Sequence, residues 1–212
     1  PSVKRFFSRI SKECLFIVSG ASEVSATALA ILQQIHSKSK INILYIQPDV
    51  SLMSETKRLL ERTVRHVLQE YTRSGVFERM FLVSNESVEE CMQDVSLRNY
   101  HEELNQVIAS CFHSINVFNH VESETDTFCR PLATSRICTF GVLDPNTGKE
   151  KLFFPLDEQS ELRYYYGIPE RQITDDKTLR KKIVNQVKER ATNGDRISYG
   201  IYSTEYETDY GY

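Results

Sequence analysis

The chain has 212 residues, of which 40% are hydrophobic and 26% charged, and its formal net charge at pH 7 is −3. This composition is ordinary for a globular protein that buries a core as one domain, or as one domain with a smaller lobe. A charge so close to neutral gives no electrostatic reason to expect binding to nucleic acid or to an anionic membrane. No apolar run approaches the roughly 20 residues of a membrane-spanning helix, and no signal peptide is visible.

The cysteines argue for a reducing compartment. There are five of them, scattered along the chain without any CxxC pair. An odd number of cysteines, mostly within apolar segments, is typical of reduced and buried thiols, so we expect a cytoplasmic protein. Because a zinc site needs clustered ligands and the sequence shows no such cluster, no metal site is expected.

The first half of the chain alternates apolar runs with amphipathic segments. The apolar runs predict strands at 15–18, 41–49 and 78–85. The amphipathic segments predict helices at 25–37, 51–73, 87–93 and 98–120. Ser51 or Ser54 is the expected N-cap of the second helix, because a serine hydroxyl can accept a bond from the first free amides. The last helix is the longest and carries one apolar stripe.

This alternation predicts βαβ crossovers and a parallel sheet. In such folds ligands bind at the carboxyl ends of the strands. Here those ends are residues 19–25, 48–51 and 84–85, and we expect them to face the same side of the sheet.

The second half has a different pattern. Residues 134–157 predict a β-hairpin around a five-residue turn at 144–148, and 162–168 predict another strand. Residues 175–190 predict a helix ended by Asn193 and Gly194, and the strand-like run 197–212 is rich in tyrosine. The predicted fold is therefore α/β. A parallel-sheet half of the nucleotide-binding type (1–121) includes the long central helix (98–120) and joins a smaller α+β half (122–212).

Four short stretches follow one another in a suggestive order. They are SGASEVSA (19–26), QPDVSLMSE (47–55), VSNES (83–87) and YHEELNQVI (100–108). Their order and spacing resemble the phosphate loop, ribose loop, first asparagine loop and central helix of the tubulin/FtsZ superfamily. This resemblance implies a cytoskeletal GTP-binding protein that binds GTP or GDP with Mg²⁺ and associates with itself into head-to-tail filaments.

The resemblance also implies roles for individual residues. The nucleotide contacts would come from Ser19, Gly20, Ala21, Ser22, Pro48, Asp49, Asn85 and Asn105. The first four would hold phosphate, the next two would border the ribose, and the two asparagines would contact guanine. In the stretch NHVESETD (119–126), Glu122, Glu124 and Asp126 would polarise water for hydrolysis in the neighbouring subunit.

The sequence also departs from the family pattern. The family's phosphate loop is a GGGTGS/T-G run, whereas this chain keeps only Gly20 and a hydroxyl at Ser22, with Glu23 where phosphate would approach. We therefore expect degraded nucleotide binding. The strands that begin a tubulin fold have no counterpart before Ser11, which predicts a fragment or a member lacking the N-terminal part of the GTPase domain. The drift of the motifs favours a phage-encoded protein.

Simpler interpretations remain for each of these residues. Residues 19–25 can be a plain strand-to-helix turn, Pro48 and Asp49 a strand end, Asn85 a helix cap, and Asn105 a solvent-facing side chain. The acidic cluster at 122–126 can be a solvated loop. The tyrosines at 164–166, 199, 202, 206, 210 and 212 are expected to pack a sheet face, or else to form an interaction surface.

Two other functions fit the same pattern. One is a non-catalytic structural or assembly protein with an α/β core, which would hold its partners through the tyrosine-rich C-terminal sheet. The other is an unrelated α/β enzyme that uses the three strand ends for a different phosphorylated ligand. Assembly without nucleotide would indicate the first, and nucleotide binding without assembly the second.

Overall fold

A computed structural model describes residues 5, 7, 10, 12–92, 96–191, 196–205 and 210–212. The chain divides into two compact units, of which unit 1 holds residues 1–94 and 133–139 and unit 2 holds 95–132 and 140–212. Each unit has its own sheet, which confirms the predicted α/β class with a parallel sheet and a second sheet. The proposed sequence halves, 1–121 and 122–212, stay a prediction.

Unit 1 is built on a four-stranded sheet, here called sheet A. Its strands in spatial order are β1 (Lys12–Ser19), β2 (Ser39–Gln47), β3 (Arg79–Ser84) and β5 (Ile137–Thr139). All neighbouring strands are parallel, with Val18 opposite Tyr45 and Tyr45 opposite Leu82. The parallel sheet expected from the alternating sequence is therefore present.

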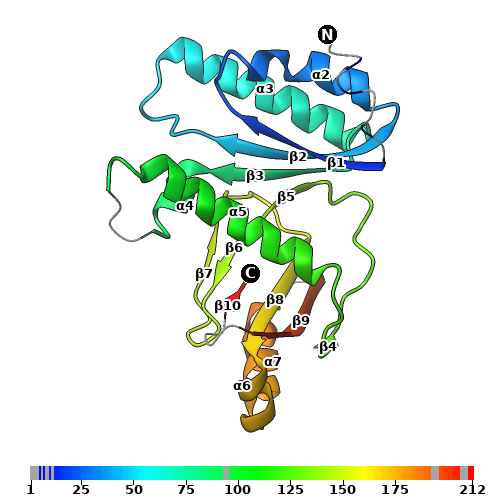
Figure 1. Ribbon diagram of the computed structural model, residues 1–212, viewed down its shortest axis with the longest axis vertical. Helices are drawn as coiled ribbons and strands as arrows, with labels where there is room; N and C mark the ends of the chain where they lie inside the picture. The colour runs from blue at the N-terminus through cyan, green and yellow to red at the C-terminus, as the bar shows by residue number, and fades with distance from the viewer. Residues whose placement is uncertain are drawn as a thin grey trace. The chain divides into compact units, whose positions relative to one another are not determined.

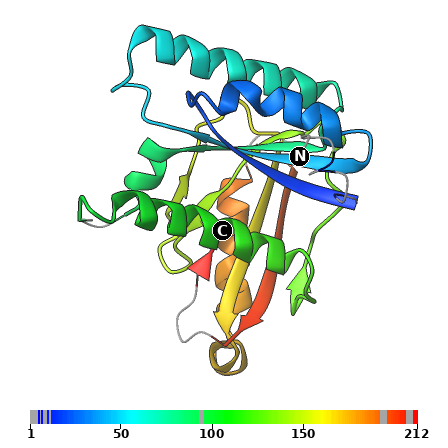
Figure 2. The same ribbon diagram turned by 45° about the horizontal axis from the view of Figure 1, so that its top comes forward.

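Helices follow the first three strands of sheet A. They are the 3-10 helix η2 (Ser25–Thr27), α2 (Ala28–Ile35), α3 (Glu55–Arg73) and the short α4 (Asn85–Glu89). Figure 1 and Figure 2 show α2 and α3 on the same face of the sheet. The Ser54 hydroxyl accepts a bond from the Lys57 amide, which confirms Ser54 as the N-cap of α3. Leu32, Ile43 and Leu82 are buried in the core of this unit.

The segment before the predicted hairpin turn differs from expectation. Instead of forming one arm of a hairpin, it divides at Phe140 between the two sheets. Strand β5 pairs in parallel with residues 80–82 of sheet A, whereas β6 (Gly141–Leu143) pairs antiparallel with β7 (Glu150–Leu152). The Arg136 side chain secures β5, because its Nη1 donates to the carbonyl oxygens of Phe77 and Glu78. The expected turn at 144–148 does join β6 to β7.

Unit 2 contains a six-stranded mixed sheet, here called sheet B. Its strands in spatial order are β4 (Thr125–Asp126), β9 (Arg196–Thr204), β8 (Glu161–Pro169), β10 (Tyr210–Gly211), β6 and β7. Among the described strand pairs of sheet B, only β8 and β9 run parallel. They are connected through α6 (Glu170–Asp175) and α7 (Leu179–Arg190), so the helix predicted at 175–190 is split. Asn193 and Gly194, its predicted end, lie outside the described residues.

The tyrosines of unit 2 pack against both faces of sheet B. Tyr164 and Tyr166 lie in a cluster with Ile183 and Val187 of α7. Tyr165 points to the opposite face and packs with Phe118, the last residue of α5 (Tyr100–Phe118). Tyr199, Tyr202, Tyr210 and Tyr212 join the same two clusters, and Tyr206 lies outside the described residues. These rings therefore form the core of unit 2, as the first of the two interpretations predicted.

The described helices include none that is both long enough and apolar enough to cross a bilayer.

A buried carboxylate connects α3 to sheet A. Glu61 is only 3% exposed, and its Oε1 accepts hydrogen bonds from Tyr45 Oη at 3.2 Å, Gln47 Nε2 at 2.9 Å and Arg65 Nε at 2.9 Å. Burial, together with the Glu61 carboxylate, raises the pKa of the Tyr45 hydroxyl above its usual range. The three donors balance the cost of burying a charge, so the network fixes the distance between helix and strand.

We expect Glu61→Ala to destabilise the protein by about 3 kcal/mol, because it leaves Arg65 and Gln47 without the buried carboxylate that accepts their hydrogen bonds. Glu70→Ala is the matched control on the same helix, since Glu70 pairs with Arg73 at the exposed surface and should contribute less than about 1 kcal/mol. Urea unfolding of both variants measures the difference. Equal free energies of unfolding for the two variants would contradict the structural role given to Glu61.

Asp176 fixes the start of α7. Its Oδ1 accepts from the Thr178 amide at 2.8 Å and from the Thr178 hydroxyl at 2.6 Å, and its Oδ2 accepts from Lys182 Nζ at 2.8 Å. The bond from Lys182 and those from Thr178 lower the pKa of Asp176 to about 2. Because the carboxylate is favoured in the folded state, this contribution to stability is complete above about pH 4, the ordinary aspartate range, and is lost as the pH falls towards 2.

Asp176→Asn should therefore flatten the dependence of stability on pH between about 4 and 2, while lowering stability at neutral pH. The measurement is the urea midpoint of unfolding as a function of pH in that window. Asp175→Asn serves as the control, since Asp175 makes one exposed ion pair with Arg171 at 3.7 Å. If the wild-type and Asp176→Asn curves stay parallel throughout, the assigned pKa is wrong.

Candidate functional site

The ends of three parallel strands meet at one edge of sheet A. The Gly20 amide, just after β1, donates to the Ile46 carbonyl oxygen of β2 at 2.8 Å. Gln47 at the end of β2 lies opposite Ser84 at the end of β3. The structure thus brings together the three loops expected to share an edge, and with them seven of the eight residues to which the resemblance gives nucleotide contacts.

The turn after β1 combines an unusual backbone with unused donors. Ala21 has φ of 60°, in the left-handed region that favours glycine. The amides of residues 21–24 donate no hydrogen bond to any residue within the described ranges. Successive free amides in a turn of this kind can form an anion-binding concavity. This is the property that a phosphate loop needs.

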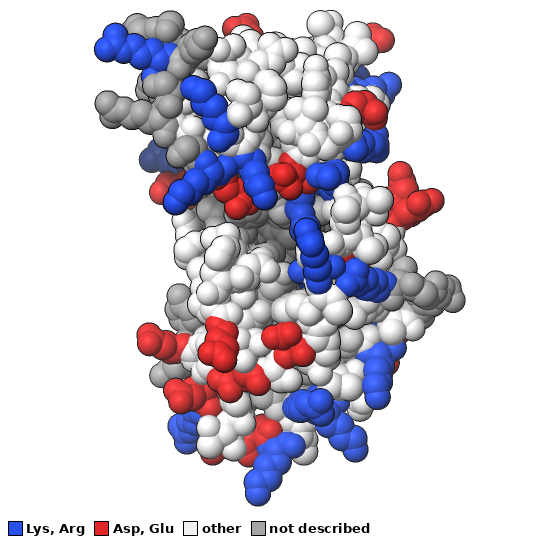
Figure 3. Space-filling model, turned by 90° about the vertical axis from the view of Figure 1, so that its right-hand side faces the viewer, with Lys and Arg blue, Asp and Glu red and all other residues white. Residues whose placement is uncertain are grey.

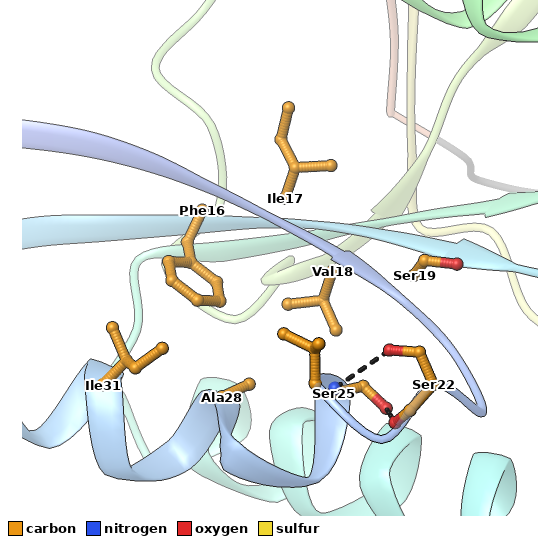
Figure 4. A pocket seen from close by; sticks show the side chains of 9 residues that line it. Phe16, Ile17, Val18, Ser19, Ser22, Ser25, Ala28 and Ile31 are labelled. Carbon is orange, nitrogen blue, oxygen red and sulfur yellow. Dashed lines mark hydrogen bonds between the residues drawn. The ribbon is translucent and has the colours of Figure 1, made fainter.

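The serines of this turn bond to each other. The Ser25 amide donates to Ser22 Oγ at 3.0 Å, and the Ser25 hydroxyl donates to the Ser22 carbonyl oxygen at 2.6 Å (Figure 4). The Ser22 side chain therefore occupies the amide of Ser25, the first residue of η2, and we call this contact the Ser22 cap. A phosphate that used the Ser25 amide would have to displace this cap.

Gly20 is required by a close approach. A Cβ at this position would lie 2.5 Å from Tyr45 Oη and 3.1 Å from Pro48 Cδ. The same Tyr45 hydroxyl donates to Glu61, so the network beneath the turn holds the first two loops against each other. Tyr45 and Glu61 were not expected from the sequence. The available signal was the position of Glu61 on the apolar stripe of α3, three residues before Val64 and seven before Leu68.

The second loop begins with Pro48 and Asp49. Asp49 Oδ1 accepts from the Ser51 amide at 2.8 Å and from the Ser51 hydroxyl at 2.5 Å, and these two bonds lower the pKa of Asp49. Such a bond pattern is a local turn that leads the chain towards α3. It accounts for the contacts of Asp49 without a ligand, and a ribose contact remains a proposal.

Asn85 is the most informative residue of the third loop. It is the first residue of α4, whose N-cap is Ser84, so it does not act as the helix cap that the sequence allowed. Its Oδ1 is buried, and no donor in the described part of the chain reaches it. A buried amide oxygen without a partner costs stability and needs an explanation, and a bound ligand with a hydrogen-bond donor would provide one.

The remaining candidates belong to unit 2, and the structure describes their surroundings within that unit only. Asn105 is exposed on α5, beside the buried Leu104. Glu122 and Glu124 are also exposed. The Asp126 carboxylate already accepts hydrogen bonds from two nearby residues, namely from the Ser123 hydroxyl and from the Phe128 amide. Among the acidic residues, Glu122 and Glu124 therefore have the freer side chains.

A small pocket lies beside the turn after β1. Its volume is about 70 Å³, and Phe16, Val18, Ala28 and Ile31 form much of its lining, with Ser22 and Ser25 at one end (Figure 4). Small-molecule sites usually measure about 300–1,000 Å³. Its lining includes no Lys or Arg. This pocket is therefore too small and too apolar to hold a nucleotide.

Charge is distributed unevenly between the units. Unit 1 has a small excess of basic residues, whereas unit 2 is acidic. Figure 3 shows acidic side chains gathered in the lower, unit 2 part of the face in view. Within the described ranges, no three His, Cys, Asp or Glu side chains lie close enough together to hold a metal ion.

No family model and no curated protein matches the sequence. Solved structures do match. An empty FtsZ dimer from M. jannaschii has a TM-score of 0.69 at 10% identity, over 99% of this chain and 64% of the FtsZ chain. A point mutant of the M. jannaschii FtsZ gives 0.59 at 10% identity, over 99% of this chain and 66% of the other.

The third match is TubZ from Bacillus thuringiensis serovar israelensis, in a GTPγS-form protofilament. Its TM-score is 0.63 at 13% identity, over 95% of this chain and 60% of the TubZ chain. This chain thus spans between 60% and 66% of the length of these proteins. At 10–13% identity, these matches show a shared fold. They confirm the fold that the sequence resemblance predicted, because this chain has the fold of FtsZ and TubZ, which are proteins of the tubulin/FtsZ superfamily.

Proposed function

We propose that this chain is a tubulin/FtsZ-like protein that binds guanine nucleotide weakly and assembles head to tail. The observation that carries the proposal is the common edge of sheet A, where three strand-end loops meet and two of them offer polar groups without described partners: the amides of residues 21–24 and the buried Oδ1 of Asn85. The likeness to an FtsZ dimer and to a GTPγS-form TubZ protofilament supports it.

The turn after β1 would hold phosphate through its backbone. The amides of 21–24 supply donors, Gly20 lets the chain pass close to Tyr45, and Ser19 and Ser22 border the same turn. Bound GTP with Mg²⁺ would supply the phosphoryl group that is transferred to water. Glu23 is exposed beside these amides and repels phosphate, so we expect affinity below that of a glycine-rich loop.

Base and ribose would be held by the other two loops. Asn85 is suited to contact guanine, because its unpaired Oδ1 can accept from the base N–H groups. Pro48 and Asp49 would border the ribose. Asn105 is proposed as the second base contact on the resemblance alone.

Hydrolysis would depend on a neighbouring copy. In a head-to-tail contact the exposed Glu122 or Glu124 of one subunit would polarise water beside the nucleotide of the next, because a free carboxylate can accept the proton from the attacking water. Asp126 is the weaker candidate, since its carboxylate already accepts two local bonds. The basic excess of unit 1 and the acidic excess of unit 2 favour contacts between unlike units of successive copies.

A non-catalytic assembly protein is the second candidate. It is favoured by the Ser22 cap, which already uses the Ser25 amide, and by the absence of Lys and Arg from the lining of the nearby pocket. Assembly through exposed tyrosines is less attractive, because Tyr164, Tyr165, Tyr166, Tyr199 and Tyr202 are buried. A cytoplasmic location and a phage origin remain predictions.

Asn85→Ala should remove guanine selectivity without destabilising the protein. GTP and GDP are expected to raise the unfolding temperature of the wild type more than ATP does, because a ligand that binds only the folded state stabilises it. The variant should bind GDP about tenfold more weakly, equivalent to about 1.4 kcal/mol. Its unliganded stability should not fall, because the deleted oxygen has no described partner.

Asn185→Ala, an exposed asparagine on α7, is the matched control and should bind GDP as the wild type does. Asn105→Ala tests the second proposed base contact in the same assay. Absence of any guanine-specific shift in the wild type would overturn nucleotide binding by this chain and favour the assembly protein.

Sedimentation with and without GTP tests assembly. We expect pelletable polymer to form with GTP and to decline as phosphate is released. Glu122→Gln and Glu124→Gln should slow phosphate release while nucleotide binding stays unchanged, since neither carboxylate is among the residues proposed to contact the nucleotide of its own subunit. Asp157→Asn, an exposed carboxylate of the same unit, is the control. Equal polymer with and without nucleotide would instead indicate a non-catalytic assembly protein.

A further inference from the structure

The loop that carries Glu122 and Glu124 is bonded to the helix that precedes it. The chain leaves α5, forms this loop and returns along β9 as β4 (Figure 1). Next to α5, the amides of His120 and Val121 both donate to the Val117 carbonyl oxygen, at 2.9 and 3.1 Å. These bonds satisfy a carbonyl group at the end of the helix and hold the first part of the loop against it.

The second part of the same loop is bonded to sheet B. The Glu124 amide donates to the Ile201 carbonyl oxygen of β9 at 2.8 Å. Further along, the Thr127 amide donates to the Tyr199 carbonyl oxygen at 2.9 Å, and Thr127 Oγ1 accepts from the Tyr199 amide at 3.0 Å. Residues 122 and 123 therefore connect a segment that is bonded to α5 with a segment that is bonded to β9.

One side chain of sheet B lies at the base of this loop. Phe118 and Phe128 flank the loop in sequence, and both rings pack against the ring of Tyr165, at centroid distances of 6.3 and 5.0 Å. The Tyr165 hydroxyl also donates to Asn119 Oδ1 at 2.9 Å. The ring and the hydroxyl of this buried tyrosine thus contact residues at both ends of the loop.

Asn119 connects Tyr165 to the helix. While its Oδ1 accepts from the tyrosine hydroxyl, its Nδ2 donates to the Ile115 carbonyl oxygen in the last turn of α5, at 2.9 Å. The Asn119 side chain is therefore held from both sides. Because Asn119 is the first residue after the helix, its conformation sets the direction in which the chain enters the loop.

We propose that Tyr165 is a positioning residue, which acts through Asn119 to hold residues 119–127 in one conformation. The ordered loop presents Glu122 and Glu124 to a neighbouring copy, so this role rests on the proposed function, in which these carboxylates polarise water. A carboxylate on an ordered loop loses less conformational entropy when it takes up its catalytic position. Tyr165 is buried and is not among the proposed nucleotide contacts, so it affects the rate of hydrolysis and not the binding of GTP.

Hydrogen exchange without nucleotide tests the order of the loop. Tyr165→Phe keeps the ring and removes only the hydroxyl, so the amides of residues 119–127 should exchange about fivefold faster than in the wild type. Tyr164→Phe is the matched control. Tyr164 is the neighbouring residue of β8, its ring lies on the opposite face of sheet B, and its hydroxyl donates to Glu150 Oε2 at 3.0 Å. This variant loses a comparable bond and should leave exchange in the loop unchanged. Equal exchange of the loop in the wild type and Tyr165→Phe overturns the proposal.

Phosphate release over a range of GTP concentrations, at equal amounts of polymer, tests the effect on hydrolysis. Tyr165→Phe should lower the maximal rate about tenfold, while the GTP concentration that gives half this rate stays within about twofold of the wild type. A general loss of stability would make Tyr164→Phe and Tyr165→Phe alike, and this result overturns the positioning role, as does an unchanged maximal rate in Tyr165→Phe. Absence of phosphate release by the wild type overturns the proposed hydrolysis, and with it the catalytic role of the loop. In that case hydrogen exchange still decides whether Tyr165 orders the loop.

Discussion

The geometry of the candidate site depends on one buried contact, that between Tyr45 and Glu61. The carboxylate comes from α3 and the hydroxyl from β2, and the same hydroxyl lies directly beneath Gly20. A side chain at Gly20 would collide with it, so the first loop passes over β2 only because position 20 has none. Arg65 and Gln47 also donate hydrogen bonds to this carboxylate, and these bonds compensate for burying its charge. Helix, strand and loop are thus positioned by one group of polar atoms.

Much of the fold could be predicted because its signals are local. Alternation of apolar runs with amphipathic segments identified three strands of sheet A and the helices between them, and parallel order followed from the connections. The segment at 137–143 could not be assigned in the same way. A short apolar run shows that a strand forms but not which sheet receives it, and here the partner residues at 80–82 are far away in sequence. Similarly, the break between α6 and α7 depends on the side-chain bonds of Asp176, which periodicity does not reveal.

The candidate site was predictable in position but not in detail. Topology alone requires that the loops after β1, β2 and β3 lie along one edge, and they do. The Ser22 cap, the left-handed Ala21 and the unpartnered oxygen of Asn85 depend on atomic positions that no motif encodes. Asn105 and the acidic residues were predicted from the resemblance alone, and their roles stay predictions.

The placement of β5 has a consequence for biosynthesis. Unit 1 consists of residues 1–94 together with 133–139, so its sheet lacks one of its strands until the ribosome has made β5. Before that point the nascent chain exposes β3, whose middle residues pair with β5 in the finished protein. Non-local pairing of this kind slows folding, because a long loop must close before the contact forms. The folding of unit 1 can therefore be completed only after α5 has been synthesised, because α5 precedes β5 in the sequence.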